Sequence, residues 1–439
     1  MNVNDLSTEQ VKELAKETYI FTYPLVIHYY TMYKMAINRD SHEYTGGWGK
    51  FLHLGLVKPG DVDIVAPNND TPYSLSWVDL RSEPWVLIMP PVEPDRYCSA
   101  QIDDLWGFVV DNVGSIKDGN EGGAFMLATR SWKGDTPEGI RRVIRGEFPF
   151  MWCNIRTQVF EEAEFPRVRE IQNSFRLMPL HQFLGTPAPS PAPEIRWMPI
   201  EYGDELKNDM FKYVNFLLPF TTPHEIDREP LEKAALLGIK PGAEWKMEDF
   251  SVPVQQAIAD GIKEAVDYID ETAKQPSPPG ERFGTREEMG VRFLHRAHGA
   301  YAGLGGSTRE QAVYLRLFKD EKGDFLDGSR HAYKVTFGKD QLPNARFFWS
   351  LTMYSLPGRF LVPNALDRFS IGSRAYDSLK HNPDGGFDIY LGRQSPGKEY
   401  ERNWLPAPDG KFTVTFRIFG PDEKVMKGEY AAPAITIVS

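Results

Sequence analysis

Pro67-Asn68-Asn69-Asp70-Thr71-Pro72-Tyr73-Ser74 sets three short polar side chains between two prolines, ahead of the apolar run Trp85-Val86-Leu87-Ile88-Met89. Each proline fixes its own φ angle, and Asn and Asp side chains bond readily to nearby backbone groups. The stretch therefore predicts a rigid turn that leads into a β-strand. Because loops on a rigid scaffold often carry functional side chains, we expect part of a site here.

Composition places the chain among ordinary globular proteins. Of its residues, 25% are charged and 41% are hydrophobic. The length of 439 residues is enough for two or three domains. Its formal net charge is −11. A nucleic-acid binder needs a basic face, and an anionic membrane repels an acidic chain, so we expect neither as a partner. A small molecule is the expected partner.

The N-terminal sequence and the two cysteines indicate the cellular compartment in which the protein is expected. Met1 to Gln10 lacks the basic and apolar regions of a secretory signal, and no long apolar run occurs. The chain as written is therefore expected to be cytoplasmic, or periplasmic if a signal has been removed. Cys98 and Cys153 lie in apolar, strand-like runs, which favours two buried free thiols over a disulfide.

Hydrophobic periodicity divides the first part of the chain into a helical and a β segment. The segment 1–59 opens with the capping box Ser7-Thr8-Glu9-Gln10 and continues at helical spacing to Tyr33. Over 60–160, short β-branched and aromatic runs alternate with Gly, Pro and Asp. That pattern predicts a first β domain.

The second part repeats this alternation. The helical period returns over 161–305, with one helix expected over 287–302 and a break at 276–280. Over 306–439, short strands separated by turns predict a second β domain. The chain is thus expected to be a multidomain α+β protein with two antiparallel β-sandwich, jelly-roll-like domains, an N-terminal helix and a central helical segment.

Two carboxylates are the leading candidates for catalysis. If Asp70 and Asp103 face one cavity, their proximity raises one pKa and creates a general acid or base. Alternatively, Asp70 caps a turn and Asp103 only ends a strand. Tyr73 and Asn69, on the rigid polar loop, complete the first set. Arg156 ends the strand 150–156 and either clamps a substrate or pairs with Asp103. We expect 67–73, Asp103 and Arg156 to converge on one pocket.

Other candidates lie outside that loop. Trp349 and Trp404 either line an apolar pocket or belong to the core, and Asn403 lies on the stiff loop before Trp404. His28 and Tyr29, near Pro24 in the first helix, either face a cavity or pack against neighbours. His295 and His298 share a helix face, but no further ligands are visible. We predict no metal site and no cofactor, and a divalent cation stays an alternative.

Several strings resemble two known families. The first part is similar to domain-of-unknown-function family 1254, through Asn69-Asp70-Thr71-Pro72-Tyr73, Trp77-Val78-Asp79-Leu80, Gln101-Ile102-Asp103 and Asn154-Ile155-Arg156-Thr157. The last part resembles family 1214, through Leu326-Asp327-Gly328-Ser329, Phe348-Trp349-Ser350-Leu351-Thr352-Met353-Tyr354, Asn403-Trp404-Leu405-Pro406 and Arg417. The resemblance implies two β-sandwich domains in tandem, helical segments around them and often a homo-oligomer. It implies no particular reaction.

Two functions remain open. The first is an enzyme, a hydrolase or lyase that uses acid–base chemistry on a small, uncharged, partly apolar molecule. The second is a non-catalytic protein whose jelly-roll domains bind a carbohydrate or another small ligand. The enzyme requires Asp70 or Asp103 in a closed site with a shifted pKa, whereas the binding protein requires an open groove floored by Trp349 or Trp404.

Overall fold

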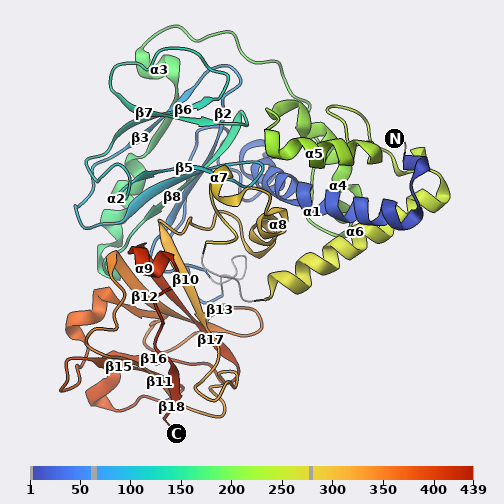
Figure 1. The fold of residues 1–439 in the computed structure, drawn as a ribbon. Helices are drawn as coiled ribbons and strands as arrows, with labels where there is room; N and C mark the ends of the chain where they lie inside the picture. The colour runs from blue at the N-terminus through green and yellow to red at the C-terminus, as the bar shows by residue number, and fades with distance from the viewer. Residues whose placement is uncertain (1–2, 61–66, 276–279, 439) are drawn as a thin grey trace.

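The computed structural model describes residues 3–60, 67–275 and 280–438 (Figure 1). The predicted break at 276–280 falls outside these residues except for Gly280. Figure 1 shows a group of helices on one side of the molecule and two β domains on the other. The predicted multidomain α+β fold is confirmed.

The first β domain is a sandwich of two sheets, with strand orders β1-β2-β8-β4-β5 and β7-β6-β3-β9. Its strands are β1 (Leu52–His53), β2 (Tyr73–Asp79), β3 (Trp85–Met89), β4 (Cys98–Asp104), β5 (Val109–Gly114), β6 (Gly123–Thr129), β7 (Ile140–Gly146), β8 (Phe150–Thr157) and β9 (Arg176–Pro179). Alternate residues of both sheets fill the core, among them Ile102, Cys153 and Phe125.

Two of these strands lie outside the predicted range 60–160. β1 pairs with β2, and β9 pairs with β3. Both are too short to show a period in the sequence, so tertiary pairing decides them. The helix α2 (Phe165–Ser174) connects the two sheets, since it follows β8 and precedes β9.

The second β domain also has two sheets. One has the order β10-β17-β12-β13 with β14 beside β12, and the other has the order β16-β15-β11-β18. Their strands are β10 (Ala312–Leu317), β11 (Tyr333–Phe337), β12 (Ala345–Ser355), β13 (Phe360–Leu361), β14 (Ser370–Gly372), β15 (Phe387–Gly392), β16 (Trp404–Pro406), β17 (Phe412–Pro421) and β18 (Ile435–Ile437). A short helix, α9 (Glu423–Met426), follows β17.

The helices form a third part, whose hydrophobic core also includes Trp77, Phe150 and Trp152 of the first β domain. They are α1 (Thr8–Met32), α4 (Asp204–Leu217), α5 (Glu225–Ala234), α6 (Val252–Ala273), α7 (Arg286–Met289) and α8 (Phe293–Ala302). The predicted capping box starts α1, since Ser7 Oγ accepts from Gln10 N at 3.2 Å and Gln10 Oε1 accepts from Ser7 N at 2.9 Å. Gly261 of α6 lets α1 pack closely, because a Cβ there would meet the backbone of Lys12.

One expectation for 161–305 is wrong. The helix expected over 287–302 is split into α7 and α8, because Gly290 with φ +50° ends the first. Between its helices the segment also contains one long irregular stretch. After the short helix α3 (Leu180–Leu184), residues 186–200 have no regular structure and contain five prolines, each of which lacks the N–H that a helix requires.

Cys98 and Cys153 are buried free thiols, as predicted. Burial raises the pKa of both thiols, that of Cys98 to about 12, so neither thiol is ionised at neutral pH. Within the ranges described, no helix is both long and apolar enough to cross a bilayer.

Candidate functional site

Part of the site is built on the outer face of the first sheet, opposite the sandwich core. In the register of this sheet, Arg156 lies beside Tyr73, Asn154 lies beside Gln101, and Trp152 lies between Trp77 and Asp103. Paired residues on adjacent strands point to the same side, so these side chains share one face. We call Tyr73, Gln101, Asp103, Asn154 and Arg156 the polar face.

Hydrogen bonds tie the polar face to the segment 303–308. Arg156 donates from Nη1 to Gln101 Oε1 at 3.0 Å and from Nη2 to the carbonyl of Gly305. Gln101 Nε2 donates to the carbonyl of Gly306 at 3.1 Å and to both oxygens of Asp103 at 2.9 and 3.1 Å. The Tyr73 ring centroid lies 5.4 Å from the guanidinium carbon of Arg156. The face is therefore ordered and closed.

Gly305 cannot be replaced easily at this contact. Its φ is +70°, and a Cβ would lie 2.6 Å from Asn154 Nδ2 and 2.8 Å from the Trp152 ring. Only glycine combines that backbone conformation with so close an approach. The glycine-rich stretch after α8 therefore serves to cover the polar face.

Asp103 has the most perturbed environment on this face. It is 3% exposed, and burial raises the pKa of its carboxyl to about 7. The hydrogen bond from Gln101 and the charge of Arg156 favour the carboxylate but do not cancel the burial effect. Near neutral pH the carboxyl is thus divided between its protonated and ionised forms, as acid–base catalysis requires.

Several buried polar atoms beside Asp103 have no hydrogen-bond partner in the part of the chain that the structure describes. They are Trp77 Nε1, Trp152 Nε1, Asn112 Oδ1, Asn154 Oδ1 and Arg156 Nε. All five side chains belong to the outer face, and the indoles of Trp77 and Trp152 stack with centroids 5.9 Å apart. Buried donors and acceptors of this kind are normally satisfied by water or a polar ligand.

Asp70 lies at the junction with the second β domain, away from the polar face. Its carboxylate accepts from Ser350 Oγ at 2.5 Å and from Arg374 Nη2 at 2.7 Å, both in the second β domain. Asn68 Oδ1 accepts from Asp70 N at 2.8 Å, which makes the turn rigid as expected. Asp70 is 1% exposed and fixes the loop to the second domain. We call Asp70, Ser350 and Arg374 the latch.

Arginine and tyrosine side chains of the second domain lie within electrostatic range of both the latch and the polar face. The carbonyl of Pro67 accepts from Tyr354 Oη at 2.5 Å, and the charge of Arg417 acts on both Asp70 and Tyr354. Tyr314 lies within electrostatic range of both Arg417 and Arg156. The structure thus brings Tyr73, Asp103 and Arg156 together and directs Asp70 to the domain junction. Asn69, partly buried nearby, keeps its Oδ1 without a hydrogen-bond partner among the residues described.

Removing the latch carboxylate is expected to destabilise the protein. Asp70→Ala leaves Ser350 and Arg374 without their acceptor in a buried junction, so the free energy of unfolding should fall by about 2–4 kcal/mol. Urea denaturation measures the change. Asp267→Ala, which breaks an exposed ion pair with Lys263, should cost under about 0.5 kcal/mol. Equal effects of the two substitutions would show that the latch does not stabilise the junction.

The tryptophan groove expected for a binding protein is not formed by Trp349. This side chain is 5% exposed and stacks on Phe337 and Phe387 in the core of the second sandwich. Asn403 is fully buried and bonds the backbone of Lys380 and Asp388. Trp404, partly buried, donates from Nε1 to the carbonyl of Gly392 at 2.7 Å. Asn403 and Trp404 thus hold neighbouring strands and loops together, because their side-chain polar atoms bond the backbone.

His28 and Tyr29 also have structural partners. His28 Nδ1 donates to the carbonyl of Pro24 at 2.8 Å, and burial with the nearby charge of Arg296 lowers its pKa to about 4. Tyr29 Oη donates to the carbonyl of Met198 at 2.6 Å, and burial raises its pKa. Neither residue is on the polar face.

The sequence did not point to a buried ion cluster near the tip of β4 and β5. Arg286 donates from Nη1 to Asp227 Oδ1 at 2.8 Å and from Nη2 to Glu147, while its guanidinium carbon lies 4.0 Å from the ring centroid of Phe108. Burial raises the pKa of neighbouring Asp104 to about 7. The capping box at Thr285 predicts the start of a helix, but it does not indicate that the side chain of Arg286 is buried.

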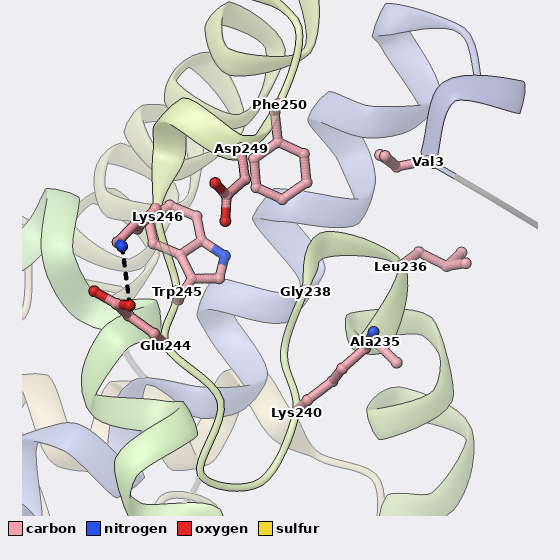
Figure 2. A pocket seen from close by; sticks show the side chains of 10 residues that line it. All are labelled: Val3, Ala235, Leu236, Gly238, Lys240, Glu244, Trp245, Lys246, Asp249 and Phe250. Carbon is pink, nitrogen blue, oxygen red and sulfur yellow. Dashed lines mark ion pairs between the residues drawn. The ribbon is translucent and has the colours of Figure 1, made fainter.

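Two cavities lie in the helical part, and none of the predicted site residues lines either of them. One, of about 360 Å³, is shown in Figure 2 beside Trp245, Phe250 and Asp249, where Lys246 pairs with Glu244 at 2.9 Å. Another, of about 40 Å³, is lined by Tyr19, Tyr23, Tyr202, Tyr301 and apolar side chains of α1, α4 and α6. Neither cavity therefore coincides with the site predicted from the sequence. Across the ranges described, no three His, Cys, Asp or Glu side chains form a group suited to a metal ion.

Comparisons with known proteins match two separate families to the two β domains. Residues 48–179 match the family described as "Protein of unknown function (DUF1254)", and residues 311–423 match "Protein of unknown function (DUF1214)". The structure resembles the VPA0106 protein from Vibrio parahaemolyticus, with 25% identity and a TM-score of 0.79 over 98% of this chain and 100% of that one. A putative uncharacterized protein from Burkholderia cenocepacia shares 12% identity over 98% of this chain and 88% of its own, with a TM-score of 0.44. No curated protein matches significantly.

Proposed function

Because the chain joins a DUF1254 domain to a DUF1214 domain, families that assign no reaction, we propose a function from the site itself. The protein is an enzyme, a hydrolase or lyase that uses Asp103 for acid–base chemistry on a small, uncharged, partly apolar molecule. Asp103 takes this role rather than Asp70, whose carboxylate is occupied by Ser350 and Arg374.

The observation that carries the proposal is the state of Asp103. A carboxyl with a pKa of about 7 donates and accepts protons near neutral pH, and it lies beside a buried guanidinium. Such a pair suits cleavage of a bond to oxygen. Asp103 protonates the leaving oxygen or removes a proton, while Arg156 stabilises negative charge that develops on oxygen.

The surrounding side chains define the substrate. The carbonyls of Gly305 and Gly306 accept the hydrogen bonds that Arg156 and Gln101 donate. A substrate oxygen that displaces them would take over the same donors. Trp77, Trp152 and Leu75 offer apolar surface next to those donors. Esters, lactones and ethers carry an oxygen acceptor beside an apolar body, so they fit this combination.

Access requires movement of the segment 303–308. This segment bonds Gln101 and Arg156 next to Asp103, and its residues Gly303 and Gly305 have φ angles of +141° and +70°. Glycine tolerates many backbone conformations, which supports a cover that opens for substrate and closes to exclude water.

The test is a turnover screen of esters, lactones, ethers and glycosides with wild type and Asp103→Asn. Asparagine keeps the shape but cannot transfer the proton, so turnover should fall by at least about a hundredfold. The pH profile of wild type should change near pH 7. Asp79→Asn, at the other end of β2 and paired with Arg81, is the control and should retain activity. Equal turnover by wild type and Asp103→Asn, or none by wild type, would refute the proposal.

A further inference from the structure

The smaller cavity of the helical part is lined by tyrosines from three separate stretches of the chain. Tyr19 and Tyr23 come from α1, Tyr202 precedes α4, and Tyr301 lies at the end of α8. Most of the other described residues that line it are apolar, among them Ile27, Met210 and Val266. We call this space the tyrosine cavity.

The tyrosine cavity has a buried floor and an open side. Tyr19 and Tyr23 are buried, and their ring centroids lie 5.9 Å apart, whereas Tyr202 and Tyr301 are exposed. Both exposed side chains are held by neighbours. The Tyr202 ring lies 5.7 Å from the Tyr30 ring, and Tyr301 Oη donates to a carboxylate oxygen of Asp270. A solute that passes the exposed rings therefore reaches the buried ones.

The hydroxyl of Tyr19 gives this floor an unused polar group. The side chain is 2% exposed, yet within the described ranges its hydroxyl forms no hydrogen bond. Buried tyrosine hydroxyls normally have a partner in the protein, in water or in a ligand. Burial also raises the pKa of Tyr19 and of Tyr23, so both hydroxyls stay neutral at neutral pH and can donate as well as accept.

The size of the cavity limits what it can hold. Its volume is about 40 Å³. One water needs about 10–15 Å³ of such space, so there is room for about three groups of that size. Ile27, Met210 and Val266 offer apolar contact, while the tyrosine hydroxyls offer polar contact. A short molecule with one apolar end and one polar end matches this lining.

The charges around the cavity favour a neutral ligand. Among the described lining residues only Lys207 is charged, and it is partly buried. The Asp270 carboxylate bonds Tyr301 on the exposed side. Charges of both signs are thus close by, and the buried floor of Tyr19, Tyr23 and Ile27 carries neither. An ion that enters would lose its hydration without gaining a buried partner, which is costly.

We propose that the tyrosine cavity binds a small uncharged molecule that carries a hydroxyl group on a short apolar body, that is, a short-chain alcohol. Its hydroxyl bonds that of Tyr19, and its apolar body packs against Ile27 and Met210. No residue of the polar face lines this cavity. The site is therefore independent of the acid–base proposal for Asp103, and binding alone tests it.

The experiment compares n-propanol, propionate and propylammonium, which are similar in length and differ in charge. Ligand-observed NMR titration of the full chain at neutral pH measures their affinities. The alcohol should bind in the millimolar range, as expected for so few atoms, and each ion should bind at least about tenfold more weakly. No binding of n-propanol, or tighter binding of either ion, would overturn the proposal.

Two variants locate the alcohol. Tyr19→Phe removes only the hydroxyl, so it should weaken n-propanol binding about tenfold or more, while the midpoint of urea unfolding without alcohol should not fall. Val266→Phe adds a ring to the wall and should abolish binding by filling the space. Tyr268→Phe, an exposed tyrosine of α6 that does not line the cavity, is the control and should bind like wild type. Affinity equal to that of wild type in either cavity variant would refute this site.

Discussion

Asp103→Asn should make the protein more stable at pH 8, although it removes the proposed catalytic group. In the folded protein, burial raises the pKa of Asp103 from about 3.8 to about 7. Asparagine has a similar shape and no charge, and it can still accept the hydrogen bond from Gln101. The substitution therefore removes the cost of an ionised carboxylate in a closed site.

The direction in which stability changes with pH follows from the number of protons bound by the folded and unfolded chains. Between about pH 4 and pH 7 the unfolded chain has released this proton and the folded chain still holds it, so stability falls as pH rises through that window. At about 1.4 kcal/mol for each pH unit, the variant should gain up to about 4 kcal/mol over wild type by pH 8. Below about pH 4 the two proteins should have similar stability.

Urea unfolding of both proteins at pH 4 and pH 8 measures this difference. Asp104, whose pKa is also raised to about 7, lies within electrostatic range of Asp103, so relief of the repulsion between the two carboxylates contributes to the expected gain. Asp118→Asn is a control of opposite sign. Burial of Asp118 acts to raise its pKa, but hydrogen bonds and the charge of Arg142 lower it overall, so this substitution should destabilise at neutral pH. A constant difference between Asp103→Asn and wild type at both pH values would contradict the assignment.

Arg286→Met should produce the largest loss of stability, about 3–5 kcal/mol. The side chains of Arg286, Glu147 and Asp227 are 5%, 5% and 3% exposed. Methionine fills part of the space but leaves two buried carboxylates without this partner. Arg130 still pairs with Glu147 at 3.0 Å, which limits the loss. The midpoint of urea unfolding at neutral pH gives the change.

Matched variants separate charge from packing. Arg167→Met removes an arginine whose side chain is 44% exposed and which pairs with Glu93 at 2.9 Å, so it should cost about 1 kcal/mol or less. Adding Glu147→Gln and Asp227→Asn to Arg286→Met should recover part of the lost stability, because the two buried carboxylates that lose Arg286 are then neutral. If the triple variant is as unstable as Arg286→Met alone, packing against Phe108 explains the loss instead.

The sequence by itself determined those elements whose causes are local. The capping box at Ser7 starts α1 because its hydrogen bonds span three residues. The run Trp85–Met89 is β3 with the predicted bounds, since β-branched and aromatic residues between turn residues favour a strand. The rigid turn before Tyr73 also follows from neighbouring residues, through the bond between Asn68 and Asp70. The tandem of two β domains was likewise visible in the quoted strings.

Only the tertiary structure decided what those residues do. Asp70 and Asp103 looked alike in sequence, but Asp70 meets Arg374 from far along the chain, while Asp103 is buried beside Gln101, which itself bonds the distant Gly306. Trp349 enters a core that three distant phenylalanines complete. Desolvation and charge depend on all neighbours in space, and most of those neighbours are distant in sequence, so no local pattern can encode them.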